Sequence, residues 1–251
     1  MERNRILEVC VDSLASARAA IRGGADRLEL CSALAVGGLT PYVTLLEQIR
    51  EESDIPVRCL MRPRGGDFLY TAEEIDMMAR QIKQLRKAGA DGFVIGCLDA
   101  EGNLDKNAMA PLLAAAAGTG LTLHRCIDVS RDPVETFRNA RELGIDTVLT
   151  SGAASNCTAG KAVIARLLEE KARSGGPEIM PGAGVNAKVI SEFLADFPQL
   201  RCFHASCKKE IESAMRFRRA GVPMGLPGLD EWHIQQTSTE AVTKAKEALL
   251  R

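Results

Sequence analysis

The stretch RILEVCVDSLASARAAIRGGADRLELC, residues 5–31, contains one complete strand–helix–strand unit. Two short apolar runs, Arg5–Val11 and Arg27–Cys31, flank a pattern with helical spacing that ends at Gly23-Gly24. Glycine at that place can supply the left-handed cap that terminates a helix. Apolar runs that alternate with helical patterns are typical of parallel sheets. The stretch therefore predicts a βαβ unit.

The same alternation recurs along all 251 residues. The eight predicted strands are Arg5–Val11, Arg27–Cys31, Val57–Met61, Gly92–Leu98, Leu121–Cys126, Thr147–Gly152, Glu178–Gly182 and Cys202–Ser206. Eight such units close an α/β TIM barrel, whereas a doubly wound sheet usually has fewer strands and often a GxGxxG turn, which is absent here. We predict one domain over residues 1–251, with a (β/α)₈ barrel at about 5–220 and a C-terminal helical extension at about 221–251.

Capping signals and repeated turns support this division of the chain. A capping box at Thr71–Glu74 begins one helix, and a second at Thr237–Glu240 begins a final helix that reaches about residue 250. Three similar turns, Gly24–Asp26, Gly89–Asp91 and Gly144–Asp146, lead directly into strands, which indicates one repeated construction. The final helix exceeds what closing the barrel needs, so we expect it to cover a barrel end or to mediate oligomer contacts.

Composition limits the classes of function. The 32 basic and 33 acidic residues give a net charge of −1, which argues against the broad positive field that nucleic acid or anionic lipid requires. The start MERNRILEVCVD is no secretory signal, and no run of about 18 apolar residues occurs, so we expect a cytoplasmic protein without membrane contact. The eight cysteines form no CxxC pair, which excludes zinc-finger spacing and favours free thiols.

Charged residues within the predicted strands point to a site. A parallel strand buried on both faces is normally apolar, and side chains alternate along it between the two faces. Glu8 and Cys10 therefore share one face of the first strand, and Glu29 and Cys31 share the same face of the second. Since the aliphatic residues between them suit the helix layer, we place all four inside the barrel.

The same reasoning brings further polar residues to the carboxyl ends of the strands, where barrels hold their active sites. We expect His124 and Cys126 to point inward, and Arg62 to pair with an inward glutamate. The acid–base candidates are Glu29, His124 and Asp128. The alternative interpretation is a buried ion-pair network that only fills the barrel.

Two glycine-containing segments favour an anionic ligand at this mouth. Residues 62–67 read RPRGGD and join two guanidinium groups to flexible glycines, and residues 180–186 read MPGAGVN before a helix. The glycines can equally be ordinary turn residues. The candidate anion-binding residues are Glu8, Arg62, Arg64, Arg125, Ser151, Gly182, Gly184 and His204.

Several long motifs resemble those of one known family. They are LEVCVDS at 7–13, GGADRLELCS at 23–32, GGLTP at 37–41, RPRGGDF at 62–68, HR at 124–125 with Asp128, LTSG at 149–152 and MPGAG at 180–184. Together they resemble the CutC copper-homeostasis family from residue 5 into the C-terminal tail. The resemblance implies a barrel, a cytosolic location and a homo-oligomer, either dimer or tetramer.

The resemblance also implies a metal. In animal members of that family two cysteines have been proposed to bind Cu(I), and the matching positions here are Cys10 and Cys31. Thiolates are soft ligands that suit Cu(I), although a buried cysteine is often only a small apolar residue. The sequence departs from the usual family pattern at Cys126, at Ala183 and near Cys207.

Two main hypotheses for function follow. The first is a copper-homeostasis protein that binds Cu(I) through inward-facing cysteines. The second is an enzyme that acts on a small anionic substrate, phosphorylated or sugar-like, at the carboxyl mouth of the barrel. A third interpretation is an oligomeric scaffold that has kept the barrel without chemistry.

Overall fold

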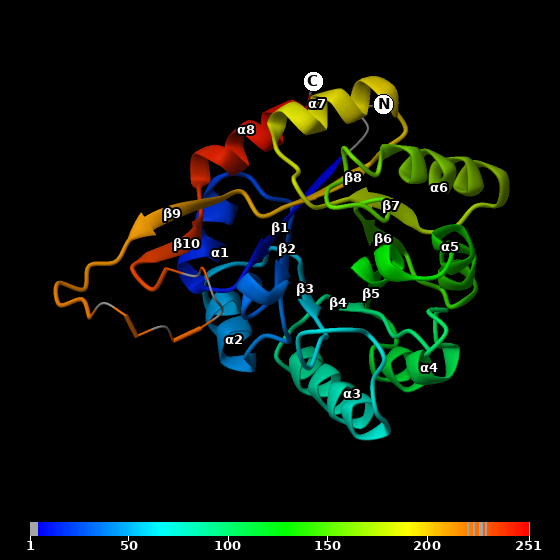
Figure 1. The fold of residues 1–251 in the computed structure, drawn as a ribbon, viewed down its shortest axis with the longest axis horizontal. Coiled ribbons are helices and arrows are strands. Elements are labelled where there is room, and N and C mark those ends of the chain that lie inside the picture. The colour runs from blue at the N-terminus through cyan, green and yellow to red at the C-terminus, as the bar shows by residue number, and fades with distance from the viewer. Residues whose placement is uncertain (1–4, 220, 223, 226–227, 229, 251) are drawn as a thin grey trace.

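Eight parallel strands form a barrel that the helices surround (Figure 1). The computed structural model describes residues 5–219, 221–222, 224–225, 228 and 230–250, so parts of the predicted tail at 221–251 lie outside the described residues. The strands are β1 (Ile6–Val11), β2 (Arg27–Leu30), β3 (Val57–Leu60), β4 (Gly92–Ile95), β5 (Gly120–Leu123), β6 (Thr147–Thr150), β7 (Glu178–Pro181) and β8 (Cys202–Ala205). Their hydrogen-bonded order is β7-β6-β5-β4-β3-β2-β1-β8, and β7 contacts β8 at the remaining edge. The predicted barrel is confirmed.

Helices follow the strands as the sequence predicts. They are α1 (Leu14–Arg22), α2 (Val43–Glu52), α3 (Ala72–Lys87), α4 (Lys106–Ala115), α5 (Pro133–Glu142), α6 (Lys161–Ser174), α7 (Ala187–Asp196) and α8 (Thr239–Leu250), with short 3₁₀ helices η1 (Leu34–Val36) and η2 (Arg125–Val129). The capping box of α3 is formed by Thr71 and Glu74. In the described part of the chain, no helix is both long enough and apolar enough to cross a membrane.

The apolar side chains divide into layers on the two sides of the sheet. Leu7, Val9 and Val11 of β1 belong to the large buried cluster that joins strands to helices. The barrel interior holds two smaller clusters, one of Cys10, Cys31, Leu60 and Val94 and one of Leu149, Met180 and Cys202. Buried charged side chains border both clusters, because Glu29 contacts Cys31 and Arg27 contacts Met180.

The fifth strand ends earlier than its sequence pattern suggests. β5 stops at Leu123 because the chain turns into η2, where His124 Nδ1 accepts the Cys126 backbone N–H at 3.2 Å. Alternation between faces ends with the strand. Strand alternation therefore does not fix the direction of Cys126, whose side chain belongs to the large buried cluster and lies against Gly96.

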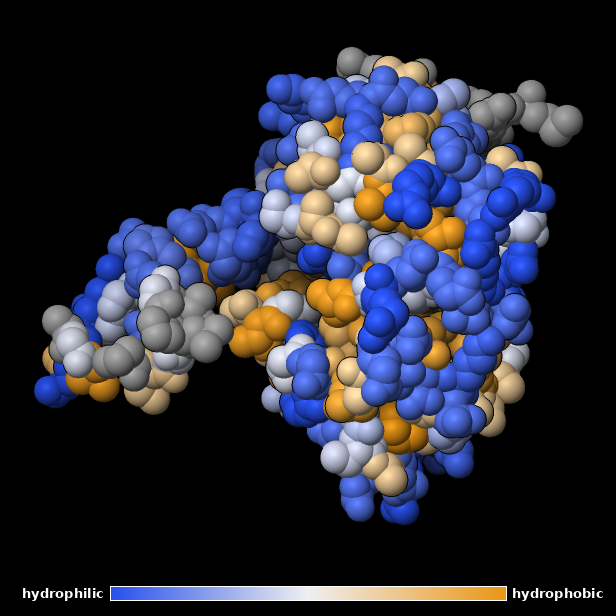
Figure 2. Space-filling model, turned by 45° about the vertical axis from the view of Figure 1, so that its right-hand side comes forward, coloured by the Kyte–Doolittle hydropathy of each residue, from blue (hydrophilic) through white to orange (hydrophobic). Residues whose placement is uncertain are grey.

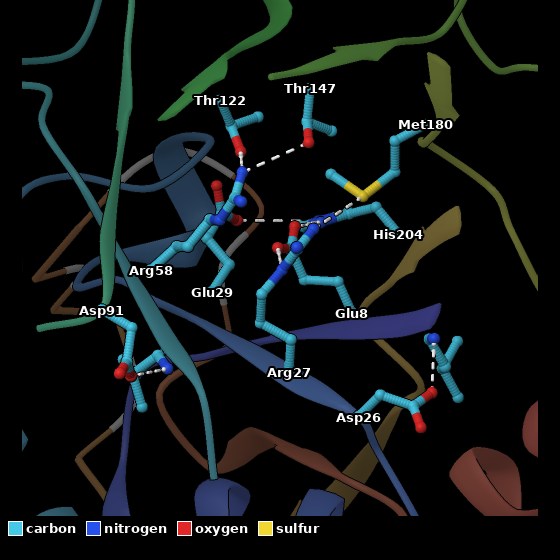
Figure 3. Close-up of polar contacts among 12 residues, drawn as sticks. Glu8, Asp26, Arg27, Glu29, Arg58, Asp91, Thr122, Thr147, Met180 and His204 are labelled. Atoms are coloured by element: carbon cyan, nitrogen blue, oxygen red, sulfur yellow. Dashed lines mark hydrogen bonds and ion pairs between the residues drawn. The ribbon is translucent and has the colours of Figure 1, made fainter. Parts of the chain in front are cut away.

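The repeated Gly-Ala/Ile-Asp turns all make the same contact with a neighbouring strand. Each aspartate, at the start of one strand, accepts a backbone N–H at the start of the preceding strand in the chain. Asp26 accepts from Leu7 at 2.7 Å, Asp91 from Val57 at 2.7 Å, and Asp146 from Leu121 at 2.6 Å. Figure 3 shows the contacts of Asp26 and Asp91. The turns thus fasten neighbouring strands at the amino-terminal end of the barrel.

The last helix completes the ring of helices. α8 packs against α1, α7 and β1, so it lies between the two ends of the ring and does not cover an end of the barrel (Figure 1). Its cap begins one residue later than predicted, because the Ser238 hydroxyl, not that of Thr237, accepts the Ala241 N–H at 3.3 Å.

A hairpin precedes α8. Strands β9 (Lys208–Glu212) and β10 (His233–Thr237) pair antiparallel and form a sheet separate from the barrel. The hairpin projects from the body of the molecule as a lobe (Figure 2). Large apolar side chains are exposed along it, among them Met215, Phe217 and Ile234.

Candidate functional site

The predicted site residues separate into groups at different places in the barrel. The first group comes from β1, β2 and β8, which are neighbours in the sheet. In the strand register Cys10 lies beside Glu29, and Glu8 lies beside His204. Cys10 and Cys31 share one interior apolar cluster, as the alternation along the two strands predicts.

Three of these side chains offer a set of metal-ligating atoms. Cys10, Glu29 and His204 each contribute one donor atom, and these atoms lie within 4.8 Å of one another. His204 Nε2 is 3.6 Å from Glu29 Oε2, and the Cys31 thiol donates to the same oxygen at 3.5 Å. A fourth potential ligand, the sulfur of Cys31, therefore borders the set. Thiol, imidazole and carboxylate meet here inside the barrel.

A buried ion pair orients this group. Glu8 is completely buried, and its carboxylate contacts Arg27 Nε at 2.5 Å and His204 Nδ1 at 2.9 Å (Figure 3). Because Glu8 holds Nδ1, the Nε2 atom of His204 faces Glu29. The prediction that Arg62 pairs with an inward glutamate is wrong, since Arg27 takes that place. The sequence carried a signal for it: Arg27 has the same parity along its strand as Glu29.

The pKa values of the titratable residues in this first group differ strongly from their ordinary values. Burial alone lowers the pKa of His204, but Cys10 and Glu29 hold that pKa well above its usual range. Burial raises the pKa of Glu29, and raises the pKa of the Cys31 thiol well above its ordinary value. In the metal-free protein the Cys31 thiol therefore keeps its proton, which a metal ion has to displace.

A second group lies after β5 and β6. The Asp128 carboxylate accepts from the Thr150 hydroxyl at 2.5 Å, the Ser151 N–H at 2.9 Å and the Ala153 N–H at 3.1 Å. Arg125 donates to Asp128 at 2.7 Å and to the Ser151 hydroxyl at 2.7 Å. The Asp128 carboxylate thus accepts hydrogen bonds from the loop and from Arg125. These donors are therefore not available to an external anion.

The remaining candidates have other surroundings. Arg64 is tied to Glu74 at 2.7 Å and to Asp67 at 3.0 Å at the surface. A side chain at Gly182 would lie 2.5 Å from Leu149 Cδ1, the tip of a leucine side chain, so glycine leaves room for that leucine. Gly184 has a φ of +80°, which favours glycine. Packing thus accounts for the first glycine and backbone conformation for the second.

Arg62 and His124 form a third group with two residues that the sequence analysis missed. The ring of Phe68 lies 4.7 Å from the His124 ring and 5.3 Å from Arg62 Cζ. Tyr70 follows two residues later, and its buried hydroxyl has no hydrogen-bond partner in the described structure. Phe68 ends the RPRGGDF motif, but neither aromatic residue was expected in the site, because they lie in an irregular segment where no strand or helix period assigns a direction to a side chain.

The fold and the first group together define a TIM-barrel protein with a candidate metal centre in the barrel interior. The CutC family profile matches residues 5–209, and the chain belongs to the CutC family. A CutC family protein of Chromobacterium violaceum is 42% identical over 98% of both chains. A human protein named copper homeostasis protein cutC homolog is 40% identical, over 88% of this chain and 80% of its own.

A solved structure supports the same assignment. The crystal structure of a CutC protein from Streptococcus agalactiae superposes with a TM-score of 0.75 and is 28% identical in sequence. It covers 80% of this chain and 98% of its own. The family, its copper-homeostasis name and the barrel are thus shown by both sequence and fold.

Proposed function

We propose that this protein takes part in copper homeostasis by binding Cu(I) as cargo inside the barrel, through Cys10 and Cys31 with His204 beside them. The observation that carries the proposal is the approach of the Cys10, Glu29 and His204 donor atoms to within 4.8 Å, with the Cys31 sulfur adjacent. Cu(I) prefers thiolate, and the neutral imidazole that His204 becomes when the ion displaces its proton also suits copper. The name of the human relative supports the choice of metal.

Glu29 supplies the proton acceptor that such a site needs. Each thiol must lose its proton when its sulfur binds the ion. The Cys31 thiol donates to Glu29 Oε2 at 3.5 Å, so its proton can pass to that carboxylate without reaching bulk solvent. Carboxylate oxygen is a hard ligand, which favours the proton-accepting role for Glu29 over direct ligation of Cu(I).

Titration of the reduced protein against a chromogenic Cu(I) chelator tests this proposal. We expect Cys10→Ser and Cys31→Ser each to weaken Cu(I) binding by at least about tenfold, the scale on which damage to a metal site is felt. Cys157→Ser is the matched control, because that buried cysteine lies in the loop after β6, away from β1 and β2. Binding by the Cys10→Ser/Cys31→Ser protein at parental strength would refute the site.

A second candidate function is an enzyme that acts on a small anionic substrate at the carboxyl mouth, with Glu29, His124 and Asp128 as acid–base groups. The observation that favours an anionic ligand is the buried charge of Arg62, which bonds to backbone carbonyl oxygens. Thermal stability of the protein with and without a phosphorylated sugar tests this candidate, because a specific ligand stabilises the native state.

We also propose that the protein assembles as a homo-oligomer in the cytoplasm through the β9–β10 hairpin, with a second copy of the chain as the partner. β9 has a free edge, because its sheet contains two strands. Antiparallel pairing of two β9 edges about Glu210 places Lys208 opposite Glu212 in both directions. These two opposite-charge pairs outnumber the one like-charge contact, which is between the two Glu210 side chains. The exposed Phe217 and Ile234 extend the surface.

Sedimentation velocity over a range of protein concentrations tests the assembly. We expect Lys208→Glu to shift the protein toward monomer, because each symmetric contact then opposes two carboxylates. The charge-swapped Lys208→Glu/Glu212→Lys protein restores the attraction and the oligomer. A monomeric parent, or a Lys208→Glu protein that sediments like the parent, would contradict this interface.

A further inference from the structure

The Arg62 guanidinium is a buried charge for which the described residues provide no carboxylate partner. Arg62 is 9% exposed, and its terminal nitrogens donate to the carbonyl oxygens of Val36 at 2.9 Å, Gly38 at 3.1 Å and Gly66 at 2.9 Å. Its Nε–H has no acceptor within the described residues. Buried charges in proteins are normally paired, so a positive charge in this state calls for an anion.

His124 presents a second donor at the same place. Its ring is 4% exposed, and Nδ1 accepts the Cys126 N–H, so the ring proton lies on Nε2. That Nε2 atom has no partner in the described structure. Burial, reinforced by the Arg62 charge, lowers the pKa of His124 to about 3. The ring is therefore neutral at physiological pH and acts as a hydrogen-bond donor, not as a proton carrier.

The Tyr70 hydroxyl is a third buried group, and it has no hydrogen-bond partner in the described part of the chain. Its ring lies 5.3 Å from Arg64 Cζ, in the segment that also contains Arg62. Burial raises the pKa of Tyr70, and the charge of Arg62 opposes that rise. Phe68 contacts both Arg62 and the His124 ring. Arg62 and His124 thus flank one aromatic side chain, and Tyr70 lies two residues after Phe68 in the segment that joins β3 to α3.

These groups select the chemistry of a ligand. They provide donors on Arg62 Nε, His124 Nε2 and the Tyr70 hydroxyl, with a single positive charge. A water molecule would satisfy the donors but would leave the charge of Arg62 without a counter-ion. A phosphate dianion would bring more negative charge than the site can neutralise. A carboxylate matches both the one charge and the two-oxygen acceptor.

We propose that Arg62, His124 and Tyr70 form a binding site for the carboxylate group of a small molecule, at the carboxyl ends of β3 and β5. This site is separate from the copper residues, which lie on β1, β2 and β8. It rests on the second candidate function and narrows it, because a carboxylate replaces the phosphorylated sugar as the anionic ligand. His124 then serves as a neutral donor in place of an acid–base group, and the site requires no catalysis.

The covering segment explains how a ligand reaches these atoms. The three donors are shielded from solvent, so the segment between β3 and α3 has to move to admit a carboxylate. Gly65 and Gly66 lie in this segment, where Gly66 has a φ of +92° and Gly65 has open space around it. Both are exposed, and the arrangement permits a local opening that leaves the barrel strands undisturbed.

Nuclear magnetic resonance of the full chain with ¹⁵N-labelled histidine tests the site, because the protein has only three histidines. The probe is acetate, titrated at constant ionic strength, with inorganic phosphate as the comparison. We expect a saturable shift of the His124 ring signals, while those of His204 and His233 stay in place. No saturable shift, or tighter binding of phosphate than of acetate, would overturn the proposal.

Tyr70→Phe gives the decisive variant because it removes one hydroxyl and keeps the ring. We expect it to weaken acetate binding by about tenfold, the factor for one hydrogen bond to a charged group. Tyr42→Phe is the control, since Tyr42 is exposed. Unchanged affinity in Tyr70→Phe would refute the site. The Cys10→Ser/Cys31→Ser protein should still bind acetate, which separates this result from that of the copper titration.

Discussion

Glu8 is the residue on which the interior charges depend. Burial alone raises the pKa of Glu8, yet Arg27 and His204 hold it at about 2, so the carboxylate is ionised inside the barrel. Glu8→Gln keeps the volume but leaves the Arg27 charge buried without a counter-ion. Removal of one partner from such a pair costs about 3–5 kcal/mol. We expect that loss in the free energy of unfolding, measured by urea denaturation.

An exposed ion pair provides the control for Glu8. Arg18 and Glu52 contact each other at the surface, where solvent screens their attraction. We expect Glu52→Gln to leave the unfolding free energy nearly unchanged. Equal effects of the two substitutions would contradict the importance of the interior pair.

His124 makes stability depend on pH. The pKa of His124 is lowered to about 3 in the folded protein, whereas in the unfolded chain it has its ordinary value of 6.5. As the pH falls below the ordinary value, the unfolded chain binds a proton that the native ring does not. The unfolding free energy should therefore fall by up to about 1.4 kcal/mol per pH unit until the pH approaches the folded pKa.

Comparison with His124→Gln isolates this contribution, because buried carboxylates also titrate at acid pH. Urea denaturation of both proteins across this pH window gives the difference in unfolding free energy. We expect the difference between parent and variant to shrink as the pH falls. Parallel pH profiles would show that His124 takes up a proton as readily in the folded protein as in the unfolded chain.

The residues show how far local geometry determines a site. The inward direction of Cys10 and Cys31 could be predicted, because alternation between faces is a property of the strand itself. The partner of Glu8 could not, because parity gives the face of a side chain but not its height in the barrel. Register places Arg27 directly beside Glu8, and register depends on packing of the whole sheet. Arg62 lies beyond the end of β3, so its side chain does not lie at the height of Glu8 in the barrel.

The aspartates at the strand starts hold the barrel together at the scale of elements. Asp91 accepts the Val57 N–H at 2.7 Å and pairs with Arg50, so it links β3 to the start of β4. We expect Asp91→Ala to lower the unfolding free energy by about 1–3 kcal/mol, because the N–H loses its acceptor. Asp76→Ala, which breaks a surface pair on α3, is the control, and an equally large loss there would argue against a special role.

Glycines within β4 and β5 make room for a long side chain that crosses the barrel. Arg58 of β3 donates to Thr122 of β5 at 2.6 Å (Figure 3). It also donates to Asp146 at 2.7 Å. A side chain at Gly92 would lie 2.5 Å from the Gly120 carbonyl oxygen and 3.0 Å from Arg58 Cγ. The strands could not keep their spacing around such a side chain.

We therefore expect Gly92→Ala to destabilise the protein by about 1–3 kcal/mol, the usual cost of overpacking. Gly65→Ala is the control, because open space surrounds that position. Urea denaturation followed by circular dichroism measures both. A Gly92→Ala protein as stable as Gly65→Ala would mean that β4 and β5 can separate without loss.

Element ends were harder to predict than elements. The sequence identifies all eight strands, because apolar runs and helix caps are local signals. It extends β5 to Cys126, because the stretch LTLHRC at 121–126 carries no glycine or proline to mark the strand end, whereas the chain already turns into η2 at Arg125. It also assigns the α8 cap to Thr237, because Thr237 and Ser238 both carry a hydroxyl and only packing decides between them.

On the scale of the whole molecule, α8 is part of the barrel and closes its ring of helices. The family match ends at residue 209, yet α8 follows the hairpin and packs on α1, α7 and β1. A side chain at Gly23 would lie 2.5 Å from Val242 Cβ, and Lys246 pairs with Asp26 at 2.6 Å. Asp26 in turn binds the start of β1. The helix is thus joined to the first strand, and we expect it to unfold together with the barrel.

Two adjacent leucines of α8 test this expectation. Leu249 is 1% exposed and Leu250 is 73% exposed, so they differ in burial but hardly in position. Leu249→Ala should cost about 2–5 kcal/mol in unfolding free energy, as for other buried leucines, and Leu250→Ala should cost little. The loss should also appear in hydrogen exchange at β1, because a helix that belongs to the ring cannot loosen alone. Faster exchange confined to α8 would instead mark it as an appendage to a barrel that is stable without it.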